Sequence, residues 1–248
     1  MGENENHVKI QIGQTKWGSM AYVANDEVGL SLFQGKLHDE DVIFTLLYNI
    51  VSRSKLILDI GAHAGSHSVL YSKINPSARI YAFEPQFNQF HVLQYNIKTL
   101  EASNVTPIKF ALGNKECGAT MCKYIRDGPN AGVSICENLA FNLGGCQLGE
   151  GGETVNIRRL DNFASELGLE TISYIKLDVE GFENIVVDGG YEIIKKYKPI
   201  LFFESNHKKI EADMAEFYIT PRHPTIFDTL KSLDYNIFDV GGGNYLAI

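Results

Sequence analysis

Short apolar runs alternate with amphipathic segments along most of this chain, and this alternation is typical of an α/β protein. Four of the runs are mostly apolar, as expected for strands that are buried on both faces. These runs cover residues 56–60, 79–85, 174–178 and 200–204. Because helical spacing separates them, the pattern predicts a parallel sheet with helices between its strands.

Two helices are indicated next to the first two strands. The helix before the first strand places six apolar residues at helical spacing: Val42, Ile43, Leu46, Leu47, Ile50 and Val51. The helix after the second strand carries a stripe made of Phe87, Phe90, Leu93, Ile97 and Leu100. We expect this stripe to be core rather than a binding surface. Residues 104–112 then read as one further strand.

The C-terminal part predicts a helix followed by a hairpin. Ile226, Leu230 and Leu233 share one helix face, because they are spaced by three and four residues. Strands at 235–240 and 244–248 flank a glycine-rich turn. We therefore expect an antiparallel hairpin at the end of the otherwise parallel sheet.

The chain reads as a single domain of residues 1–248 with two less regular parts. Residues 1–39 form a short strand-rich extension, long enough to cover a ligand site as a lid. Residues 115–155 form an insertion, and within it residues 126–152 contain seven glycines in 27 positions, too many for a regular element. We expect a loop or flap there, which is either a lid or a disordered insertion.

Composition narrows the class of protein. The chain has 248 residues, of which 44% are hydrophobic, enough for one large core. A net charge of -8 disfavours a surface that follows nucleic-acid phosphates, so nucleic acid is not an expected partner. The chain has no run of about 18 apolar residues and starts without the pattern of a secretory signal, so we expect a cytoplasmic protein without membrane insertion. Four cysteines match no common zinc-site spacing: Cys117, Cys122, Cys136 and Cys146.

The first strand leads into a glycine loop that is typical of a nucleotide-like cofactor site. Residues 56–70 read LILDIGAHAGSHSVL, a strand, a tight turn and a helix start. A dinucleotide fingerprint, G-x-G-x-x-G, would need glycine where His63 and Ser66 stand. The loop instead reads D-x-G-x-x-x-G, from Asp59 through Gly61, which suits an adenosine with a short amino-acid tail. S-adenosylmethionine is the candidate, although the two glycines could also serve only the turn and packing.

An acid at the end of the second strand strengthens this interpretation. Glu84 follows Gly61 by 23 positions, close to the offset of about 20 residues at which an acid binds the ribose diol of a nucleotide. A carboxylate suits two neighbouring hydroxyl donors. The alternative is a solvated acid at a strand end that Pro85 terminates.

The chain resembles the FkbM family of class I S-adenosylmethionine-dependent methyltransferases. The matching motifs are LDIGAHAG (58–65), YAFEP (81–85), FALGN (110–114), RLDNF (159–163), IKLDVEGFE (175–183) and PILFFE (199–204). Their order and spacing cover roughly residues 40–205. Residues 1–35 and 115–155 match only loosely, and we expect substrate choice to depend on them.

The resemblance implies a Rossmann-like fold, with a mostly parallel seven-stranded sheet, helices on both faces and the C-terminal hairpin. It also implies methyl transfer from S-adenosylmethionine to a hydroxyl of a sugar, glycan or related metabolite. By resemblance the loop lines the methionine part of the cofactor and Glu84 binds the ribose. The expected cofactor-binding set is Asp59, Gly61, Ala62, His63, Gly65, Ser66, Glu84, Pro85, Ala111 and Asp178.

Methyl transfer to an alcohol also needs the hydroxyl to be aligned and its proton removed. Asp178, at the end of the third apolar run, is the first candidate, as base, as the group that orients the hydroxyl, or as a ligand of Mg or Mn together with Glu204. Lys176, Glu180 and His207 complete the candidate catalytic set. Alternatively, Lys176 and Asp178 could form a buried ion pair that only orders the strand end.

Other polar residues have simpler expected roles. We expect Asp161 to be a helix N-cap. His38, Asp39 and Glu40 could contact substrate or cofactor, but a helix start is the commoner role for such residues.

Two other functions remain open. One is an NAD-dependent oxidoreductase, which His63 and the terminal hairpin disfavour. The other is a noncatalytic cofactor-binding module on the same fold.

Overall fold

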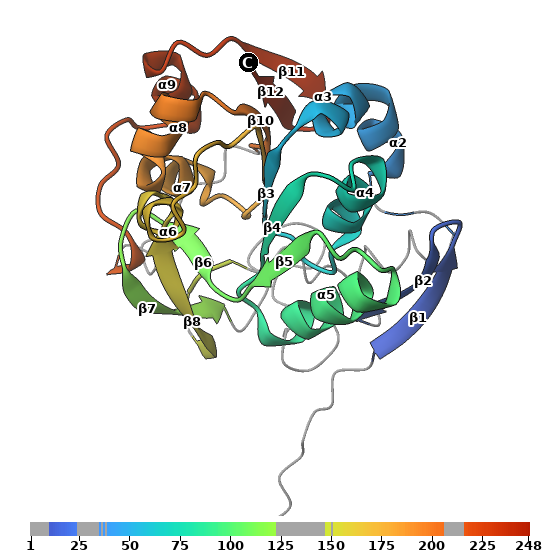
Figure 1. The fold of residues 1–248 in the computed structure, drawn as a ribbon. Coiled ribbons are helices and arrows are strands. Elements are labelled where there is room, and N and C mark those ends of the chain that lie inside the picture. The colour runs from blue at the N-terminus through green and yellow to red at the C-terminus, as the bar shows by residue number, and fades with distance from the viewer. Residues whose placement is uncertain are drawn as a thin grey trace, which may run out of the picture.

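The structure, a computed structural model, describes residues 10–23, 35, 37, 39–122, 147–149, 151–205 and 216–248. Its centre is a seven-stranded sheet with the order β11-β12-β10-β9-β3-β4-β5 (Figure 1). The strands are β3 (Leu56–Ile60), β4 (Arg79–Phe83), β5 (Val105–Ile108), β9 (Tyr174–Leu177), β10 (Ile200–Glu204), β11 (Ile237–Gly241) and β12 (Asn244–Ala247). Neighbouring strands are parallel except that β12 runs antiparallel to β10 and β11. The expected mostly parallel sheet with a C-terminal antiparallel hairpin is confirmed.

Side chains of the central strands alternate between two hydrophobic clusters. In β3, Leu56, Leu58 and Ile60 pack in one cluster, whereas Ile57 packs in the other. All five residues of β3 are buried. The strand therefore faces apolar side chains on both sides, which is why its sequence is a continuous apolar run instead of an alternating one.

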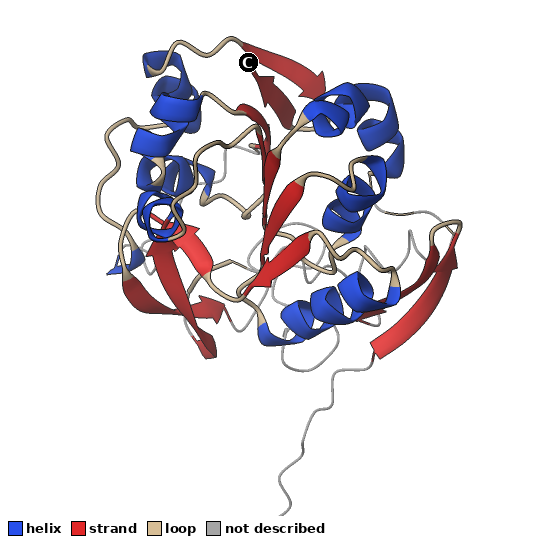
Figure 2. Ribbon diagram, viewed as in Figure 1, coloured by secondary structure: helices blue, strands red, loops and turns tan. Residues whose placement is uncertain are grey.

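Helices cover both faces of the sheet (Figures 1 and 2). One face carries α2 (Glu40–Val42), the π-helical segment η1 (Ile43–Leu47), α3 (Tyr48–Arg53), α4 (Ser66–Ile74) and α5 (Phe87–Thr99). The other carries α6 (Leu160–Glu166), α7 (Glu183–Gly189), α8 (Tyr191–Tyr197) and α9 (Ile226–Ser232). This is the Rossmann-like arrangement that the motifs implied.

The single strand expected at 104–112 is wrong, because the chain forms two strands there. β5 ends at Ile108, and β6 (Ala111–Gly113) joins β7 (Cys117–Cys122) and β8 (Gly151–Arg159) in a separate sheet of order β6-β8-β7. β5 is an edge strand and contains Pro107, which has no N–H to donate to a further strand. The chain can therefore leave the large sheet at this edge and pair elsewhere.

Two expected side-chain roles are also corrected. Phe87 of the supposed core stripe is 52% exposed, and its ring lies 4.3 Å from the ammonium of Lys109. Asp161 is not the N-cap of α6, since Arg159 occupies that position. The Asp161 carboxylate instead accepts the backbone N–H of Ile193 at 3.1 Å, in the first turn of α8. It satisfies a helix start that is distant in sequence, which local spacing cannot predict.

The described part of the N-terminal extension contains an antiparallel hairpin, β1 (Ile10–Thr15) and β2 (Gly18–Val23). The fully buried amide of Asn96, on α5, fastens it: its oxygen accepts the N–H of Ala21 at 2.7 Å, and its nitrogen donates to the carbonyls of Ala21 at 2.9 Å and Ala64 at 2.8 Å. One side chain thus connects the hairpin to the glycine loop after β3. The roles of residues 1–39 as a lid and of 115–155 as a flap stay predictions.

Candidate active site

Backbone contacts from both neighbouring strands hold the loop after β3, residues 61–65. The N–H groups of Gly61 and Ala62 both donate to the carbonyl of Phe83, at 3.1 and 2.9 Å. Gly61 has a φ of +81°, and a Cβ there would lie 1.8 Å from the carbonyl oxygen of Asp178. Position 61 therefore needs glycine, both for its left-handed backbone and for the close approach of β9's end.

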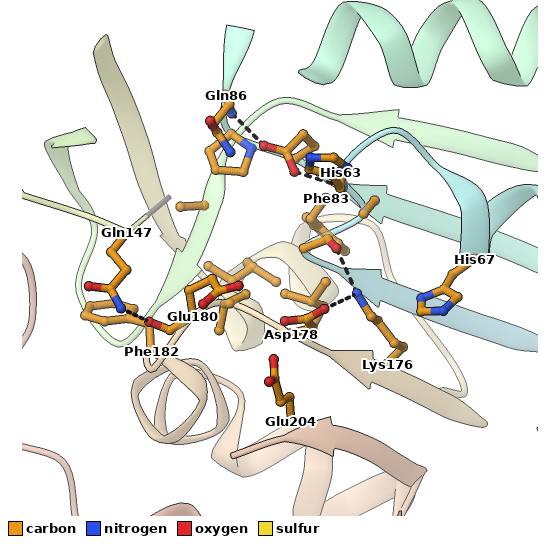
Figure 3. Close-up of a pocket in the computed structure, with 18 of the residues that line it drawn as sticks. His63, His67, Phe83, Gln86, Gln147, Lys176, Asp178, Glu180, Phe182 and Glu204 are labelled. Carbon is orange, nitrogen blue, oxygen red and sulfur yellow. Dashed lines mark hydrogen bonds and ion pairs between the residues drawn. The ribbon is translucent and has the colours of Figure 1, made fainter. Parts of the chain in front are cut away.

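A cavity of about 450 Å³ opens at the carboxyl ends of β3, β4, β9 and β10 (Figure 3). Ligands of open α/β sheets bind at this edge, in pockets of roughly 300–1,000 Å³. Most of the residues expected from the sequence line the cavity: Gly61, Ala62, His63, Ser66, Glu84, Pro85, Ala111, Lys176, Asp178, Glu180 and Glu204. Residues as distant in sequence as Ile60 and Gly242 thus meet at one place.

Two expected cofactor residues lie behind the cavity wall instead of in it. Asp59 is fully buried; its carboxylate accepts the hydroxyl of Ser68 at 2.5 Å and lies 3.8 Å from the ammonium of Lys176. Gly65 is the N-cap of α4. It has a φ of +87°, and a Cβ there would lie 2.6 Å from the side chain of Leu93. Both residues shape the loop from beneath, and neither is among the described residues that line the cavity.

Glu84 is a buried acid that organises the loop across from it. One carboxylate oxygen accepts the N–H of His63 and the other accepts the N–H of Gln86, both at 2.9 Å. Only 3% of Glu84 is exposed, and this burial raises its pKa above the ordinary value, although the charge of His63 and the two N–H donors act in the opposite direction. Each oxygen keeps a further lone pair for a ligand hydroxyl in the cavity.

Lys176 and Asp178 form an ion pair at the end of β9. Their charged groups are 3.2 Å apart, and Lys176 also donates to the carbonyl of Gly61 at 2.9 Å. Burial alone would lower the pKa of Lys176, but the charges of Asp178 and Asp59 raise it above the ordinary value. Lys176 is therefore a fixed cation that ties the cavity floor together, as in the structural alternative, while Asp178 remains partly exposed to the cavity.

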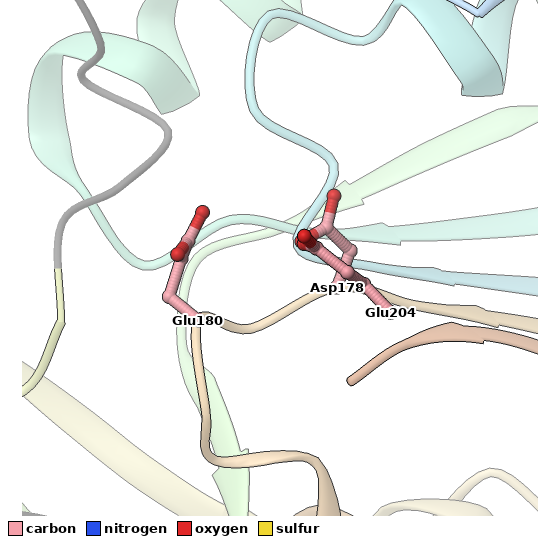
Figure 4. A group of neighbouring side chains, drawn as sticks. All are labelled: Asp178, Glu180 and Glu204. Carbon is pink, nitrogen blue, oxygen red and sulfur yellow. The ribbon is translucent and has the colours of Figure 1, made fainter. Parts of the chain in front are cut away.

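Asp178, Glu180 and Glu204 form an acidic cluster in the cavity wall (Figure 4). Each offers a carboxylate oxygen, and these atoms lie within 4.8 Å of one another. Burial raises the pKa of Asp178, but the charge of Lys176, its hydrogen bond to Asp178 and a hydrogen bond shared between Asp178 and Glu204 outweigh this and lower it. His207, the other catalytic candidate, lies outside the described residues, as do His38, Cys136 and Cys146.

The turn that carries Glu180 depends on the first residue of α7. Glu180 has a φ of +56°, and the buried carboxylate of Glu183 accepts the N–H groups of Val179 and Gly181, at 3.1 and 3.0 Å. Burial raises the pKa of Glu183 to about 7. The EGFE segment of the sequence is therefore a turn whose shape is set by its own last residue.

Several cavity residues were missed in the sequence. They include His67, Gln86, Phe110, Gln147 and Phe182. His67 follows the glycine loop directly, so its place in the first turn of α4 was a usable signal. Gln147, which donates to the carbonyl of Glu180 at 2.9 Å, comes from a distant segment, and no local pattern indicates it.

Within the described part of the chain, none of the helices has the length and apolar character needed to span a bilayer.

Comparison of the sequence with known proteins points to methyltransferases. The family model of the methyltransferase FkbM domain matches residues 59–237. The 2-O-methyltransferase NoeI of Sinorhizobium fredii is 28% identical over 171 residues, which are 64% of this chain and 67% of that protein. Methyltransferase 1 of Beauveria bassiana is 26% identical over 145 residues, 54% of this chain and 57% of that protein.

Among solved structures, methyltransferase FkbM of Methylobacillus flagellatus superposes with a TM-score of 0.50 at 17% sequence identity. The match covers 79% of this chain but only 44% of the other. It shows a shared Rossmann-like fold. The family model spans well over half of the sequence, and the chain therefore belongs to the FkbM family of class I methyltransferases.

Proposed function

We propose that this protein transfers a methyl group from S-adenosylmethionine to a hydroxyl oxygen of a sugar, glycan or related small metabolite. The observation that carries the proposal is the cavity at the carboxyl ends of the strands, bordered by the glycine loop and by Glu84. The oxygen specificity is supported by the relative named 2-O-methyltransferase. The free thiol of Cys117 suits a reducing, cytoplasmic location.

The residues present fit this cofactor. Glu84 offers carboxylate lone pairs to a ribose diol, and Gly61 and Ala62 of the glycine loop line the cavity beside it. The Ser66 hydroxyl lines the cavity, is buried, and has no hydrogen-bond partner among the described residues. A buried orphan hydroxyl is costly unless a ligand satisfies it. When bound, S-adenosylmethionine supplies a methyl group activated by a positively charged sulfur.

We assign the chain's own residues two tasks. The cavity walls exclude water from the reacting atoms, and Asp178 orients the acceptor hydroxyl, because its carboxylate is partly exposed to the cavity and Lys176 fixes its position. Replacement of Asp178 by Asn should lower kcat by about 10- to 100-fold while the affinity for S-adenosylhomocysteine changes little.

The acidic cluster also fits a divalent cation, since carboxylate oxygens are the ligands that Mg and Mn prefer. Such an ion would be held by Asp178 and Glu204 and would supply positive charge next to the acceptor oxygen. Chelation with EDTA tests this role. Loss of turnover that Mg or Mn restores would support a bound divalent ion. Unchanged turnover would mean that the carboxylates of the cluster bind the hydroxyls of the acceptor directly.

Isothermal titration calorimetry with S-adenosylhomocysteine and with NAD tests the cofactor. We expect binding of the first only, and Glu84→Ala should weaken it about 10- to 100-fold, because hydrogen bonds to a charged acceptor are lost. Glu170→Ala, an exposed glutamate far from the cavity wall, is the matched control. Binding of NAD without S-adenosylhomocysteine would refute the proposal, and binding without methyl transfer to any acceptor would indicate a noncatalytic module.

A further inference from the structure

His67 is a buried histidine in the cavity wall that faces a carboxylate from another part of the chain. It lies in the first turn of α4, lines the cavity, and is 7% exposed. Its Nε2 lies 3.5 Å from a carboxylate oxygen of Asp39, the residue that precedes α2. Asp39 has a φ of +54° and makes no side-chain capping hydrogen bond to α2. Its carboxylate is thus directed to the histidine and not to its own helix.

The surroundings of His67 hold the ring in place. Its imidazole stacks on Tyr71, with ring centroids 5.8 Å apart and planes within 11°. The Tyr71 hydroxyl in turn meets that of Tyr174 on β9 at 3.2 Å. In the described part of the chain, the charged groups near His67 are Asp39, from the segment before α2, and the Lys176 and Asp178 pair from the end of β9. Figure 3 shows His67 together with this pair.

We propose that His67, oriented by Asp39, is the general base that accepts the proton of the acceptor hydroxyl. The inference deepens the proposed function and rests on it. An imidazole next to a carboxylate is the usual protein arrangement for taking a proton near neutral pH, because the carboxylate fixes the ring and stabilises the imidazolium.

Asp178 is less suited to this task. The ammonium of Lys176 lies 3.2 Å from its carboxylate and stabilises the charged form, which weakens the carboxylate as a proton acceptor. The two residues therefore divide the work: Asp178 orients the hydroxyl, and His67 removes the proton.

Methyl transfer breaks the acceptor O–H bond and the S–C bond of the cofactor and forms one C–O bond. The acceptor O–H bond breaks and its electron pair stays on oxygen, which uses a lone pair to form the new C–O bond to the methyl carbon. The electron pair of the broken S–C bond stays on sulfur, which becomes a neutral thioether. The proton passes to the imidazole of His67 and from there to solvent after the product leaves.

The first test compares pH–rate profiles of the wild type with those of two variants. Methyl transfer from S-adenosylmethionine to a panel of methyl glycosides is measured between pH 5 and 9. His67→Gln should lower kcat by about 100-fold or more and remove the acid limb of the profile. Asp39→Asn should keep the acid limb but move it to lower pH, because the neighbouring negative charge that stabilises an imidazolium is lost.

The matched control is His91→Gln, since His91 is an exposed histidine on α5. Its profile should equal that of the wild type. Calorimetry with S-adenosylhomocysteine should give the same affinity for all these variants, which shows that the cavity is intact. A wild-type profile that survives in His67→Gln would overturn the proposal.

A chemical rescue separates proton transfer from packing. His67→Ala leaves a gap in the cavity wall, and added imidazole should restore turnover, whereas pyrazole, of the same shape but a much weaker base, should not. Equal rescue by both compounds would assign His67 a filling role and refute the base.

A readout that needs no turnover tests the pairing itself. The NMR titration of the His67 imidazole in the protein without ligand should move to lower pH in Asp39→Asn, and an unchanged titration would refute the coupling. If the wild type binds S-adenosylhomocysteine but methylates no glycoside, the acceptor class in the proposed function is wrong, and the NMR result still decides whether Asp39 and His67 act as a pair.

Discussion

Replacement of Asn96 by alanine should release the N-terminal hairpin from the rest of the protein. The Asn96 amide is fully buried and satisfies three backbone groups: the N–H and carbonyl of Ala21 and the carbonyl of Ala64. The variant leaves all three without their partner. A buried polar group that loses its partner costs about 1–3 kcal/mol.

The size of the expected stability loss depends on whether the hairpin stays docked on the rest of the protein. If β1 and β2 stayed docked, the three orphaned groups would cost about 3–9 kcal/mol in total. Undocking would let water reach these groups, so the free energy that docking of the hairpin contributes limits the loss. We therefore expect a loss of about 3 kcal/mol in the free energy of unfolding, or a Tm lower by about 6–12 °C for a chain of this size.

Thermal unfolding and hydrogen exchange measure the two parts of this expectation. Amides of β1 and β2 should lose protection in Asn96→Ala, whereas those of β3 and β4 should keep theirs. Asn162→Ala is the matched control, because Asn162 is exposed and its amide donates to Glu116 at the surface. The reasoning fails if both variants lose the same stability, or if hairpin protection is unchanged.

Three further perturbations follow from the site. Gly61→Ala should weaken S-adenosylhomocysteine binding by about tenfold or more and should also destabilise the fold, since its Cβ would meet the carbonyl of Asp178. Wild-type affinity in calorimetry would contradict the requirement for glycine at this position. The raised pKa of Glu183 means that the folded state holds its proton up to about pH 7, so this residue's contribution to stability falls as pH rises from about 4.5 to about 7. Glu183→Gln should lack that slope in urea unfolding measured at each pH, and equal slopes in both proteins would refute the burial argument. Lys176→Met leaves Asp59 and Asp178 without their cation and should destabilise the protein by about 3 kcal/mol in chemical denaturation, whereas a neutral effect would mean that the ion pair contributes nothing net.

The central strands could be predicted from sequence because burial on both faces leaves a continuous apolar run. β3 and β4 are such runs. The glycines that follow β3 have positive φ, a conformation that favours glycine, so the turn could also be predicted from the residue type. Glu84 could also be predicted, because one βαβ unit fixes the distance between a loop and the acid at the next strand end.

Other parts depend on pairings that no local pattern specifies. Residues 104–112 are divided between two sheets by the position of β8, which lies more than 40 residues later in the chain. Asp161 caps the start of α8 and not its own helix. The pairing of Asp39 with His67 likewise joins residues 28 positions apart, so the sequence could indicate Asp39 only as a residue near a helix start.

The small sheet beside the cavity makes one stretch of the chain exchangeable. Cys122 at the end of β7 pairs with Gly151 at the start of β8, and the Cys122 N–H donates to the carbonyl of Gln147 at 2.8 Å. The two anchoring points therefore lie side by side next to the residues Met121 and Leu148, which line the cavity. Because the entropy of closing a loop grows only slowly with its length, segments of different length can be inserted between these anchors at little cost to the fold. Grafting this segment between homologous proteins therefore tests whether it sets the choice of acceptor, as the sequence analysis expects, while the anchoring strands stay the same.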